Sequence, residues 1–311
     1  MDFAHGAPVA GDLDVEWSHG VPRGGADPGP PIQVHEYDEH TIILRQSKST
    51  HYEAPFLYLL MGNDRAVLFD TGATPDPAVF PLRETVDRLL ASWQARNGRP
   101  DHHLVVAHSH AHGDHVAADE QFASRADTTV VGHDPMAVQQ FFGFASWPEE
   151  VVQLDLGGRV LEVTGIPGHH PASIAVFDPW TGFLLTGDSV YPGRLYADDM
   201  TDFLASAERL VELAAARPVR HVMGCHIEMT RTPGRDYPIG TTYQPDEPPL
   251  QLAPDRLLAV RDAARAATAR PGVHVFPDFL IFNGTGPTAM PRLMLRTLRQ
   301  RLAARWGRLT S

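Results

Sequence analysis

The chain has 311 residues, of which 43% are hydrophobic and 21% charged, the composition of an ordinary globular protein with a large core. Its formal net charge of −12 argues against nucleic-acid binding, because neutralising phosphates requires an excess of Lys and Arg. Cys225 is the only cysteine, which excludes an intrachain disulfide and a cysteine-rich zinc site.

The N-terminal part predicts a surface arm and no export or membrane segment. MDFAHGAPVAGDLDVEW carries acids where a secretory signal has a basic start and an apolar core, and no later run approaches membrane-spanning length. We therefore expect a cytoplasmic protein that does not enter a membrane. Residues 1–31 are rich in Gly, Pro and Asp without periodicity, which predicts an irregular arm.

The next segments predict strands followed by helices. HTIILRQ, FLYLLMG and AVLFDTG are short β-rich runs separated by turn signals, which is typical of an antiparallel meander. Residues 81–95 have apolar side chains at helical spacing, and HLVVAHSH has the pattern of a buried strand that runs into a loop. Asp134 followed by Pro135 predicts the start of a short helix over DPMAVQQFF.

The second half again mixes strands with helices. GRVLEVTGIPG and SIAVFDPWTGFLLTGD predict strands, TDFLASAERLVELAAA a helix, and RHVMG a further strand. The proline-rich QPDEPP ends this pattern. We expect one catalytic domain over residues 32–245, with residues 246–311 as an extension packed on it.

The extension ends in an arginine-rich helix that begins near Pro291. Leu295, Leu298, Leu302 and Trp306 lie near one face of this helix, and arginines occupy most of the rest. Because the chain as a whole is acidic, we expect the helix to dock on its own body or on a second subunit. The second arrangement would be a homodimer.

The local sequence AHSHAHGDHVA places four histidines and an aspartate within eight positions. In an extended loop, residues two apart project to the same side, so His108, His110 and His112 offer overlapping pairs of imidazoles to one cation. Asp114 and His115 would then serve a neighbouring cation. Imidazole and carboxylate ligands together suit zinc, manganese or iron.

This segment resembles the HxHxDH signature of the metallo-β-lactamase superfamily, which matches only when the first histidine is His110. FDTG at 69–72, PGHH at 167–170, LLTGDSVY and GCH at 224–226 resemble further motifs of that family in the same order. The resemblance covers roughly residues 40–230. It implies an α/β fold, the four-layer αβ/βα sandwich of the family, in which helices flank two central sheets.

The resemblance also implies a site with two divalent metal ions, zinc first, with manganese or iron as alternatives. One ion would be held by His110, His112 and His169, and the other by Asp114, His115 and His226. Asp188 would lie between the two ions as a bridging carboxylate.

Such a site makes hydroxide available at neutral pH, and the resemblance therefore implies a metal-dependent hydrolase. Asp114 would orient the nucleophile and take its proton. Tyr191 is either a residue that reaches the substrate's oxygen, as a tyrosine does in the acyl-homoserine lactonases, or a packed aromatic. Asp70 is either an ordinary turn residue or a group that steadies a ligand histidine.

We expect three neighbouring features to have no direct part in the chemistry. His170 and Cys225 flank predicted ligands and should point elsewhere. The aromatic cluster FFGFASW at 141–147 is typical of a core, although it could also form an apolar wall over the metals.

The expected reaction is hydrolysis of a small-molecule ester, lactone, thioester or amide, with a lactonase-like activity first. One alternative is a persulfide dioxygenase, which shares HxHxDH but uses a single iron ion, and another is a β-lactamase-like amidohydrolase. The β-lactamases of the family lack the bridging aspartate, which is present here as Asp188. A metal-binding protein without turnover is a third class.

Overall fold

The first of two central sheets contains the N-terminal strands. The computed structural model describes residues 2–3, 5, 11–22, 25–100, 102–285 and 287–307, with side chains up to residue 302. Six strands form this sheet in sequence order: β1 (Ile32–Asp38), β2 (Thr41–Gln46), β3 (Phe56–Met61), β4 (Arg65–Phe69), β5 (His103–Ala107) and β6 (Thr128–Val130). The first four strands are antiparallel, which confirms the predicted meander, and β5 and β6 continue in parallel.

The second sheet faces the first and has the order β13-β12-β10-β9-β8-β7. Its strands are β7 (Val151–Asp155), β8 (Val160–Gly165), β9 (Ile174–Asp178), β10 (Phe183–Gly187), β12 (His221–Gly224) and β13 (Gln251–Leu252). Because β9 is antiparallel to both β8 and β10, and β12 is parallel to β10, three of these strands run in the same direction.

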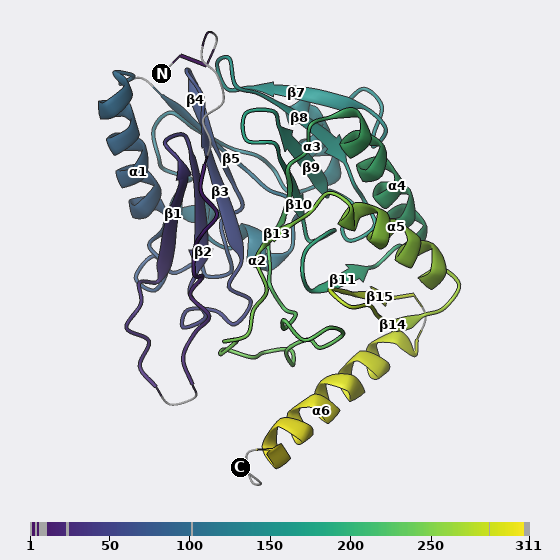
Figure 1. Ribbon diagram of the computed structural model, residues 1–311. Coiled ribbons are helices and arrows are strands. Elements are labelled where there is room, and N and C mark those ends of the chain that lie inside the picture. Colours follow the sequence, from purple (N-terminus) through teal and green to yellow (C-terminus); the bar gives the residue numbers. More distant parts are fainter. Residues whose placement is uncertain are drawn as a thin grey trace.

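Helices cover the outer face of each sheet, as Figure 1 shows. α1 (Leu82–Asn97) packs on the first sheet, and α4 (Met200–Ala216) and α5 (Arg256–Ala267) pack on the second. Along β3, the side chains of Phe56, Tyr58 and Leu60 enter the core between the sheets, and those of Leu57 and Leu59 enter the core under α1. This alternation follows from the two-residue period of a strand. It produces the four layers of the predicted αβ/βα sandwich.

Three short helical elements surround the loops at one end of the first sheet. They are α2 (Gly113–Val116), a 3₁₀ turn (Asp119–Gln121) and α3 (Pro135–Phe142). The Asp134 side chain accepts hydrogen bonds from the backbone N–H groups of Met136 and Ala137, so it caps α3 as predicted.

The C-terminal residues pair with strands from earlier in the chain. β11 (Arg194–Ala197) is parallel to β15 (Leu280–Asn283), which is antiparallel to β14 (Gly272–Val275), so these three form a small third sheet. α5 packs against α4, and β13 pairs with β12. Residues 246–311 thus contribute to two sheets and one helical layer.

The last helix, α6 (Ala289–Gly307), projects from the body (Figure 1). Ala289 and Leu293 are buried beside the third sheet, whereas Leu295, Leu298 and Leu302 are 46–54% exposed. The leucine face therefore does not dock on the chain's own body, because a different face of the helix makes that contact. The side chain of Trp306 lies outside the described ones, and a homodimer formed through this face stays a prediction.

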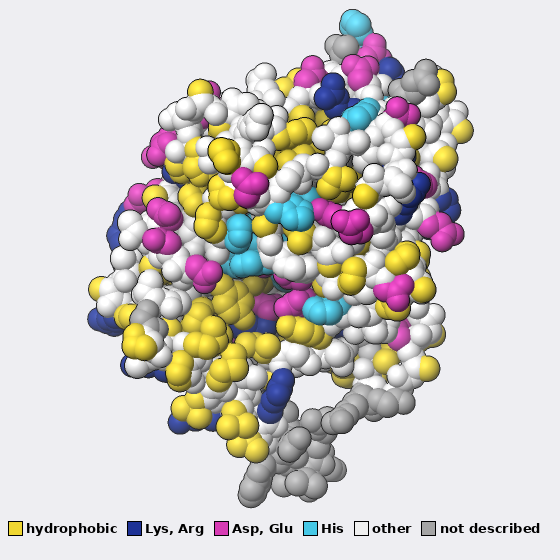
Figure 2. Space-filling view, turned by 180° about the vertical axis from the view of Figure 1, so that it is seen from behind, with side chains coloured by type: hydrophobic (Ala, Val, Ile, Leu, Met, Phe, Trp, Pro, Cys, Tyr) yellow, Lys and Arg dark blue, Asp and Glu magenta, His cyan; other side chains and the backbone are white. Residues whose placement is uncertain are grey.

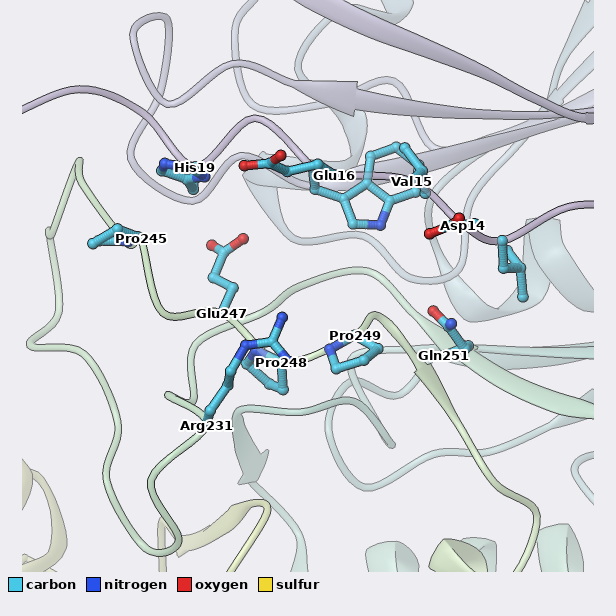
Figure 3. A pocket seen from close by; sticks show the side chains of 12 residues that line it. Asp14, Val15, Glu16, His19, Arg231, Pro245, Glu247, Pro248, Pro249 and Gln251 are labelled. Carbon is cyan, nitrogen blue, oxygen red and sulfur yellow. The ribbon is translucent and has the colours of Figure 1, made fainter.

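The described part of residues 1–31 is an irregular segment laid on the surface. Trp17 anchors it through an edge-on contact with Phe56 at 4.9 Å. Asp14, Glu16 and His19 line one side of a cavity of about 450 Å³, and Pro245–Gln251 supply most of the other side (Figure 3). None of the predicted metal ligands lines this cavity. No helix within the described ranges is long and apolar enough to cross a bilayer.

Candidate metal centre

The seven predicted ligands lie in loops and a short helix that follow the carboxyl ends of strands. The loop after β5 carries His110 and His112 and continues into α2, which carries Asp114 and His115. The other three ligands follow strands of the second sheet that run in the same direction, and they are His169 after β8, Asp188 after β10 and His226 after β12. One edge of the sandwich therefore collects all seven.

Two glycines let these loops approach one another closely. Gly168 has φ +125°, and a Cβ placed there would lie 2.3 Å from the backbone nitrogen of Phe203. Gly187 has φ +52°, and its Cβ would lie 2.8 Å from that of Ser109. A side chain at either position would push a ligand loop away from its neighbour.

The first ligand group consists of three imidazoles. His110 Nε2 lies 3.1 Å from His112 Nδ1 and 3.1 Å from His169 Nε2. Burial, followed by the neighbouring imidazoles, lowers the pKa of His110 well below its ordinary value, and burial also lowers the pKa of His169. Both rings are therefore neutral near pH 7, the form in which imidazole binds a metal.

The second group combines two imidazoles with two carboxylates. The Asp114 carboxylate lies 3.3 Å from His115 Nε2 and 3.2 Å from His226 Nε2, and the two ring nitrogens are 3.3 Å apart. Burial lowers the pKa of His226, but Asp188 and Asp114 outweigh it and raise that pKa to about 9. The group thus favours a positive charge at its centre.

Asp188 lies between the two groups. One carboxylate oxygen, Oδ1, is 3.6 Å from His115 Nε2 and 3.4 Å from His226 Nε2, and the other, Oδ2, is 3.8 Å from His169 Nε2. Oδ1 is buried and has no hydrogen-bond partner. A buried oxygen without a donor costs ~1–3 kcal/mol, and a cation between the groups would remove that cost.

Hydrogen bonds on the far side of the rings fix which nitrogen faces the centre. His169 Nδ1 donates to the carbonyl of Tyr196 at 2.8 Å, and His226 Nδ1 donates to the carbonyl of Glu53 at 3.2 Å. His115 Nδ1 lies 2.9 Å from the buried carboxylate of Asp70. With Nδ1 held in this way, Nε2 is the nitrogen of all three rings that faces the centre, and it can bind a metal ion once it carries no proton.

These separations fit cation ligands better than hydrogen bonds. Tetrahedral zinc with Zn–N bonds of 2.0–2.1 Å holds its nitrogens about 3.3–3.4 Å apart. A nearby group, His108, Asp119 and His133, provides the contrast, because each of its imidazoles is 2.9 or 2.6 Å from an Asp119 oxygen. The first is an ordinary N–H···O length and the second a short one, so both contacts are hydrogen bonds between imidazole and carboxylate.

A cavity of about 240 Å³ opens on the two ligand groups. In Figure 2, histidine and acidic side chains lie next to one another near the middle of one face. Besides five predicted ligands, the lining consists of Tyr52, Glu53, Tyr191, Arg194, Tyr196, Asp198, Glu228 and Ile239. A buried pair of ligand groups below a small polar cavity is an arrangement suited to catalysis on a small molecule.

Comparison with known proteins decides the family. Residues 54–226 match the family model described as the metallo-beta-lactamase superfamily, and this range contains all seven ligands and more than half of the chain. The chain belongs to this superfamily.

The curated relatives of this superfamily member include hydrolases of acyl compounds. A hydroxyacylglutathione hydrolase of Synechococcus sp. is 27% identical over 218 residues, which cover 67% of this chain and 76% of the relative. The human acyl-coenzyme A thioesterase MBLAC2 is 26% identical over 211 residues, 55% of this chain and 72% of the relative. This metallo-β-lactamase superfamily member is similar to both enzymes.

Solved structures support the same fold. The metallo-beta-lactamase FIM-1 from Pseudomonas aeruginosa matches with a TM-score of 0.51 and 13% identity, over 77% of this chain and 97% of FIM-1. TMB-1 matches with a TM-score of 0.50 and 15% identity, over 77% of this chain and 99% of TMB-1. At such low identity, the match concerns the architecture alone.

The residues next to the ligands have the following places. Asp70 accepts hydrogen bonds from the Ser109 N–H and hydroxyl as well as from His115, so it does steady a ligand histidine. Cys225 is buried with its thiol 3.2 Å from Asp70, and burial raises the pKa of the thiol, which makes it a poor ligand. The FFGFASW cluster packs on the core between the sheets, as expected, and does not line the 240 Å³ cavity.

Tyr191 lines the cavity, but its hydroxyl is buried and already has partners within the protein. It donates to the carbonyl of Arg194 at 2.5 Å, and a Glu228 oxygen lies at 3.1 Å. Its ring packs edge-on against His226. A role of Tyr191 toward the substrate therefore stays a prediction.

Of the residues that line the cavity, sequence reasoning found the five predicted ligands and Tyr191, and it missed others, among them Tyr196, Glu53 and Asp198. Tyr196 accepts a hydrogen bond from Arg194 Nε at 3.1 Å, and burial, followed by the charge of Glu228, raises the pKa of its hydroxyl to about 12. Glu53 and Asp198 belong to no motif. No sequence signal marked these residues, because their own backbone groups make the hydrogen bonds to the ligand loops, and such bonds do not depend on side-chain type.

Proposed function

We propose that this chain is a dinuclear metal-dependent hydrolase that cleaves the acyl bond of a small thioester, ester or lactone. The two metal-ligand groups and the cavity above them supply the parts that such a reaction needs. Thioesters come first because the two relatives described above, a hydroxyacylglutathione hydrolase and an acyl-coenzyme A thioesterase, are named for acyl derivatives of the thiols glutathione and coenzyme A.

The observation that carries the proposal is the position of Asp188. Its carboxylate has one oxygen near two imidazoles of the second group and the other oxygen near an imidazole of the first. A carboxylate placed in this way suits a pair of cations rather than one. This favours the dinuclear hydrolase over the alternative with a single iron ion.

His110, His112 and His169 would hold one cation, and Asp114, His115 and His226 the other, with Asp188 shared. Divalent ions in such a site, zinc in the first instance, activate water at neutral pH and polarise an acyl carbonyl. The protein's own task is to keep the ligands fixed and the cavity small.

Asp114 would orient the attacking water by accepting a hydrogen bond from it. Burial raises the pKa of this carboxyl, but His115 and His226 outweigh burial and hold the pKa well below its ordinary value. The group is therefore ionised at neutral pH and lines the cavity. After attack, the acyl carbon–sulfur or carbon–oxygen bond breaks, and the products are a carboxylic acid and a thiol or an alcohol.

Tyr196 would contact the substrate from the opposite wall. Its raised pKa keeps the hydroxyl protonated at neutral pH, so it can donate a hydrogen bond to an oxygen of the acyl group. Tyr191, if it moves its hydroxyl from the Arg194 carbonyl, would be a second donor.

A substrate panel tests the proposal. Zinc-loaded and manganese-loaded protein is assayed with a thioester, an aryl ester, a lactone, a chromogenic β-lactam and a phosphodiester, with the Asp188→Asn and Asp119→Asn variants alongside. Asp119 is a matched control because it is likewise a carboxylate next to two imidazoles, from which it accepts hydrogen bonds, but it belongs to neither ligand group.

We expect turnover of an acyl substrate that falls at least ~10²-fold in Asp188→Asn and little in Asp119→Asn. Turnover of the phosphodiester alone would contradict the proposal. Oxygen uptake by protein that holds one iron ion would favour the dioxygenase instead.

A further inference from the structure

Two carboxylates flank the metal-ligand groups without belonging to either. Glu53 lies on the loop between β2 and β3, and Asp198 follows β11. Both line the 240 Å³ cavity that opens on the ligands. Neither is a predicted metal ligand, and the proposed hydrolysis gives neither of them a task.

Backbone hydrogen bonds tie each of these acids to a ligand. The carbonyl of Glu53 accepts the Nδ1–H of His226 at 3.2 Å. The N–H of Asp198 donates to the carbonyl of Gly168 at 2.8 Å, directly before His169. One acid is thus fixed beside the second ligand group and the other beside the first.

No lysine or arginine neutralises these two acids within the part of the chain that the structure describes. Glu53 accepts a hydrogen bond from the Tyr52 hydroxyl at 2.7 Å and lies 3.4 Å from His51 Nδ1. Asp198 is exposed and forms no salt bridge with a described lysine or arginine. Its carboxylate is therefore open to the solvent.

Among the described residues that line the cavity, Arg194 is the one lysine or arginine, and its charge is already paired. Arg194 pairs with Glu228 and with Asp236, and it also donates to the carbonyl of Tyr237. Its charge is therefore balanced inside the protein. Lys48, the only lysine of the chain, is buried, does not line this cavity and donates to the carbonyl of Tyr52.

Apart from the two metal ions of the proposed function, which would face the acyl carbonyl and the water, a substrate with a negative charge near its acyl bond would find no unpaired lysine or arginine among the described residues that line this cavity. A positive group there would meet one carboxylate on each side. A unit charge within about 7 Å of such a group in a partly solvated site changes affinity by roughly three- to tenfold.

We propose that Glu53 and Asp198 determine specificity, and that the substrate carries a cationic group, such as a quaternary or primary ammonium, next to its acyl bond. This inference rests on the proposed acyl hydrolysis. It separates this chain from enzymes whose substrates carry anionic glutathione or coenzyme A.

The test uses two series of thioesters on the holoenzyme. The first varies the thiol of an acetyl thioester: thiocholine is cationic, 2-mercaptoethanol neutral and thioglycolate anionic. The second keeps one neutral thiol and varies the acyl group: betainyl is cationic, propanoyl is neutral, and malonyl with a free second carboxylate is anionic. Release of thiol gives kcat/KM for each, at low and at high salt, and metal content is measured for every protein.

We expect kcat/KM for the cationic member to exceed that for the anionic member at least ~10-fold in one of the series, and salt to reduce this ratio. Glu53→Gln and Asp198→Asn should each reduce the ratio roughly threefold or more. Glu84→Gln, which removes an exposed acid on α1 outside the cavity, should leave the ratio unchanged. Because the backbone groups of Glu53 and Asp198 make the ligand contacts, both variants should keep their metals.

Equal or greater kcat/KM for the anionic members of both series would overturn this inference while leaving acyl hydrolysis intact. The inference would also be overturned if Glu53→Gln and Asp198→Asn changed the cationic-to-anionic kcat/KM ratio no more than Glu84→Gln does. Failure of the metal-loaded enzyme to hydrolyse any thioester, together with turnover of a phosphodiester, would overturn both this inference and the proposed function.

Discussion

Replacing Asp70 by asparagine should weaken the second metal site without touching a ligand. Asp70 is fully buried, and its two oxygens face the Ser109 N–H and hydroxyl, the Cys225 thiol and His115 Nδ1. Asparagine keeps one acceptor oxygen and replaces the other by an NH₂ group, which has no acceptor capacity. At least one of these donors then loses its partner.

The consequence for His115 follows from its two nitrogens. If the amide NH₂ faces Nδ1, the ring is stabilised with its proton on Nε2, and the lone pair directed at the metal-ligand group is lost. If the amide oxygen faces Nδ1 instead, the NH₂ group replaces the oxygen that accepts from the Ser109 N–H, and that hydrogen bond to the loop that carries His110 is lost. Removing such an outer hydrogen bond typically weakens metal binding roughly 10- to 100-fold. We also expect the metal-free protein to lose about 1–3 kcal/mol of unfolding free energy.

Zinc titration by calorimetry, together with thermal unfolding of the metal-free protein, measures both effects. Asp119→Asn is the control, because Asp119 accepts from His108, His133 and Thr71 but contacts no ligand histidine. Two zinc ions should bind to wild type and to Asp119→Asn, whereas Asp70→Asn should bind the second ion roughly 10- to 100-fold more weakly. Equal zinc affinities in the two variants would refute this reasoning.

Three further predictions concern backbone, pH and hydroxyl groups. Gly168→Ala should lower the unfolding free energy by about 1–3 kcal/mol and impair metal binding, because a Cβ at this position would lie 2.3 Å from a backbone atom. Gly113→Ala is the control, because a Cβ at residue 113 would meet no atom within 4 Å. Thermal melts should show a change of less than ~0.5 kcal/mol in its unfolding free energy. Burial lowers the pKa of Lys48 to about 7, below the 10.5 of an ordinary lysine, so the unfolded chain binds one more proton between these values and stability rises with pH there. Denaturant unfolding from pH 7 to 9 should show that the unfolding free energy of Lys48→Met rises less steeply with pH than that of wild type, by up to ~1.4 kcal/mol per pH unit. Equal slopes for the two proteins would contradict the lowered pKa of Lys48. Tyr191→Phe should mainly lower the unfolding free energy, by about 0.5–1.5 kcal/mol. Tyr196→Phe should lower kcat/KM roughly tenfold with little change in melting temperature. The reverse pattern would indicate that Tyr191, and not Tyr196, contacts the substrate.

The two clusters of candidate ligands could be predicted from the sequence because their pattern is partly local. The separation of His110, His112, Asp114 and His115 is a property of one loop, and the glycine motifs mark where His169, Asp188 and His226 follow strands. Strand alternation and helical spacing are likewise local patterns, so the meander, α1 and the capped start of α3 were predictable. The expectation that the residues after β8, β10 and β12 meet at one site came from the family resemblance and not from a local pattern.

Features that depend on distant contacts could not be predicted. The pairing of β11 with β15 joins residues more than eighty positions apart, and no pattern within either strand encodes it. The α6 leucines appeared to be a docking face, but the third sheet contacts the turn of the helix that carries Ala289 and Leu293. Glu53 and Asp198 reach the cavity because their backbones bond ligand loops, and a backbone bond leaves no trace in side-chain type.

The most direct test of the account is a crystal structure of the zinc-loaded protein with anomalous data collected on both sides of the zinc edge. The account predicts two anomalous peaks about 3.5–4 Å apart, one among His110, His112 and His169 and one among Asp114, His115 and His226, with Asp188 contacting both. A single peak at full zinc occupancy, or peaks located at the His108 and His133 group instead, would contradict it.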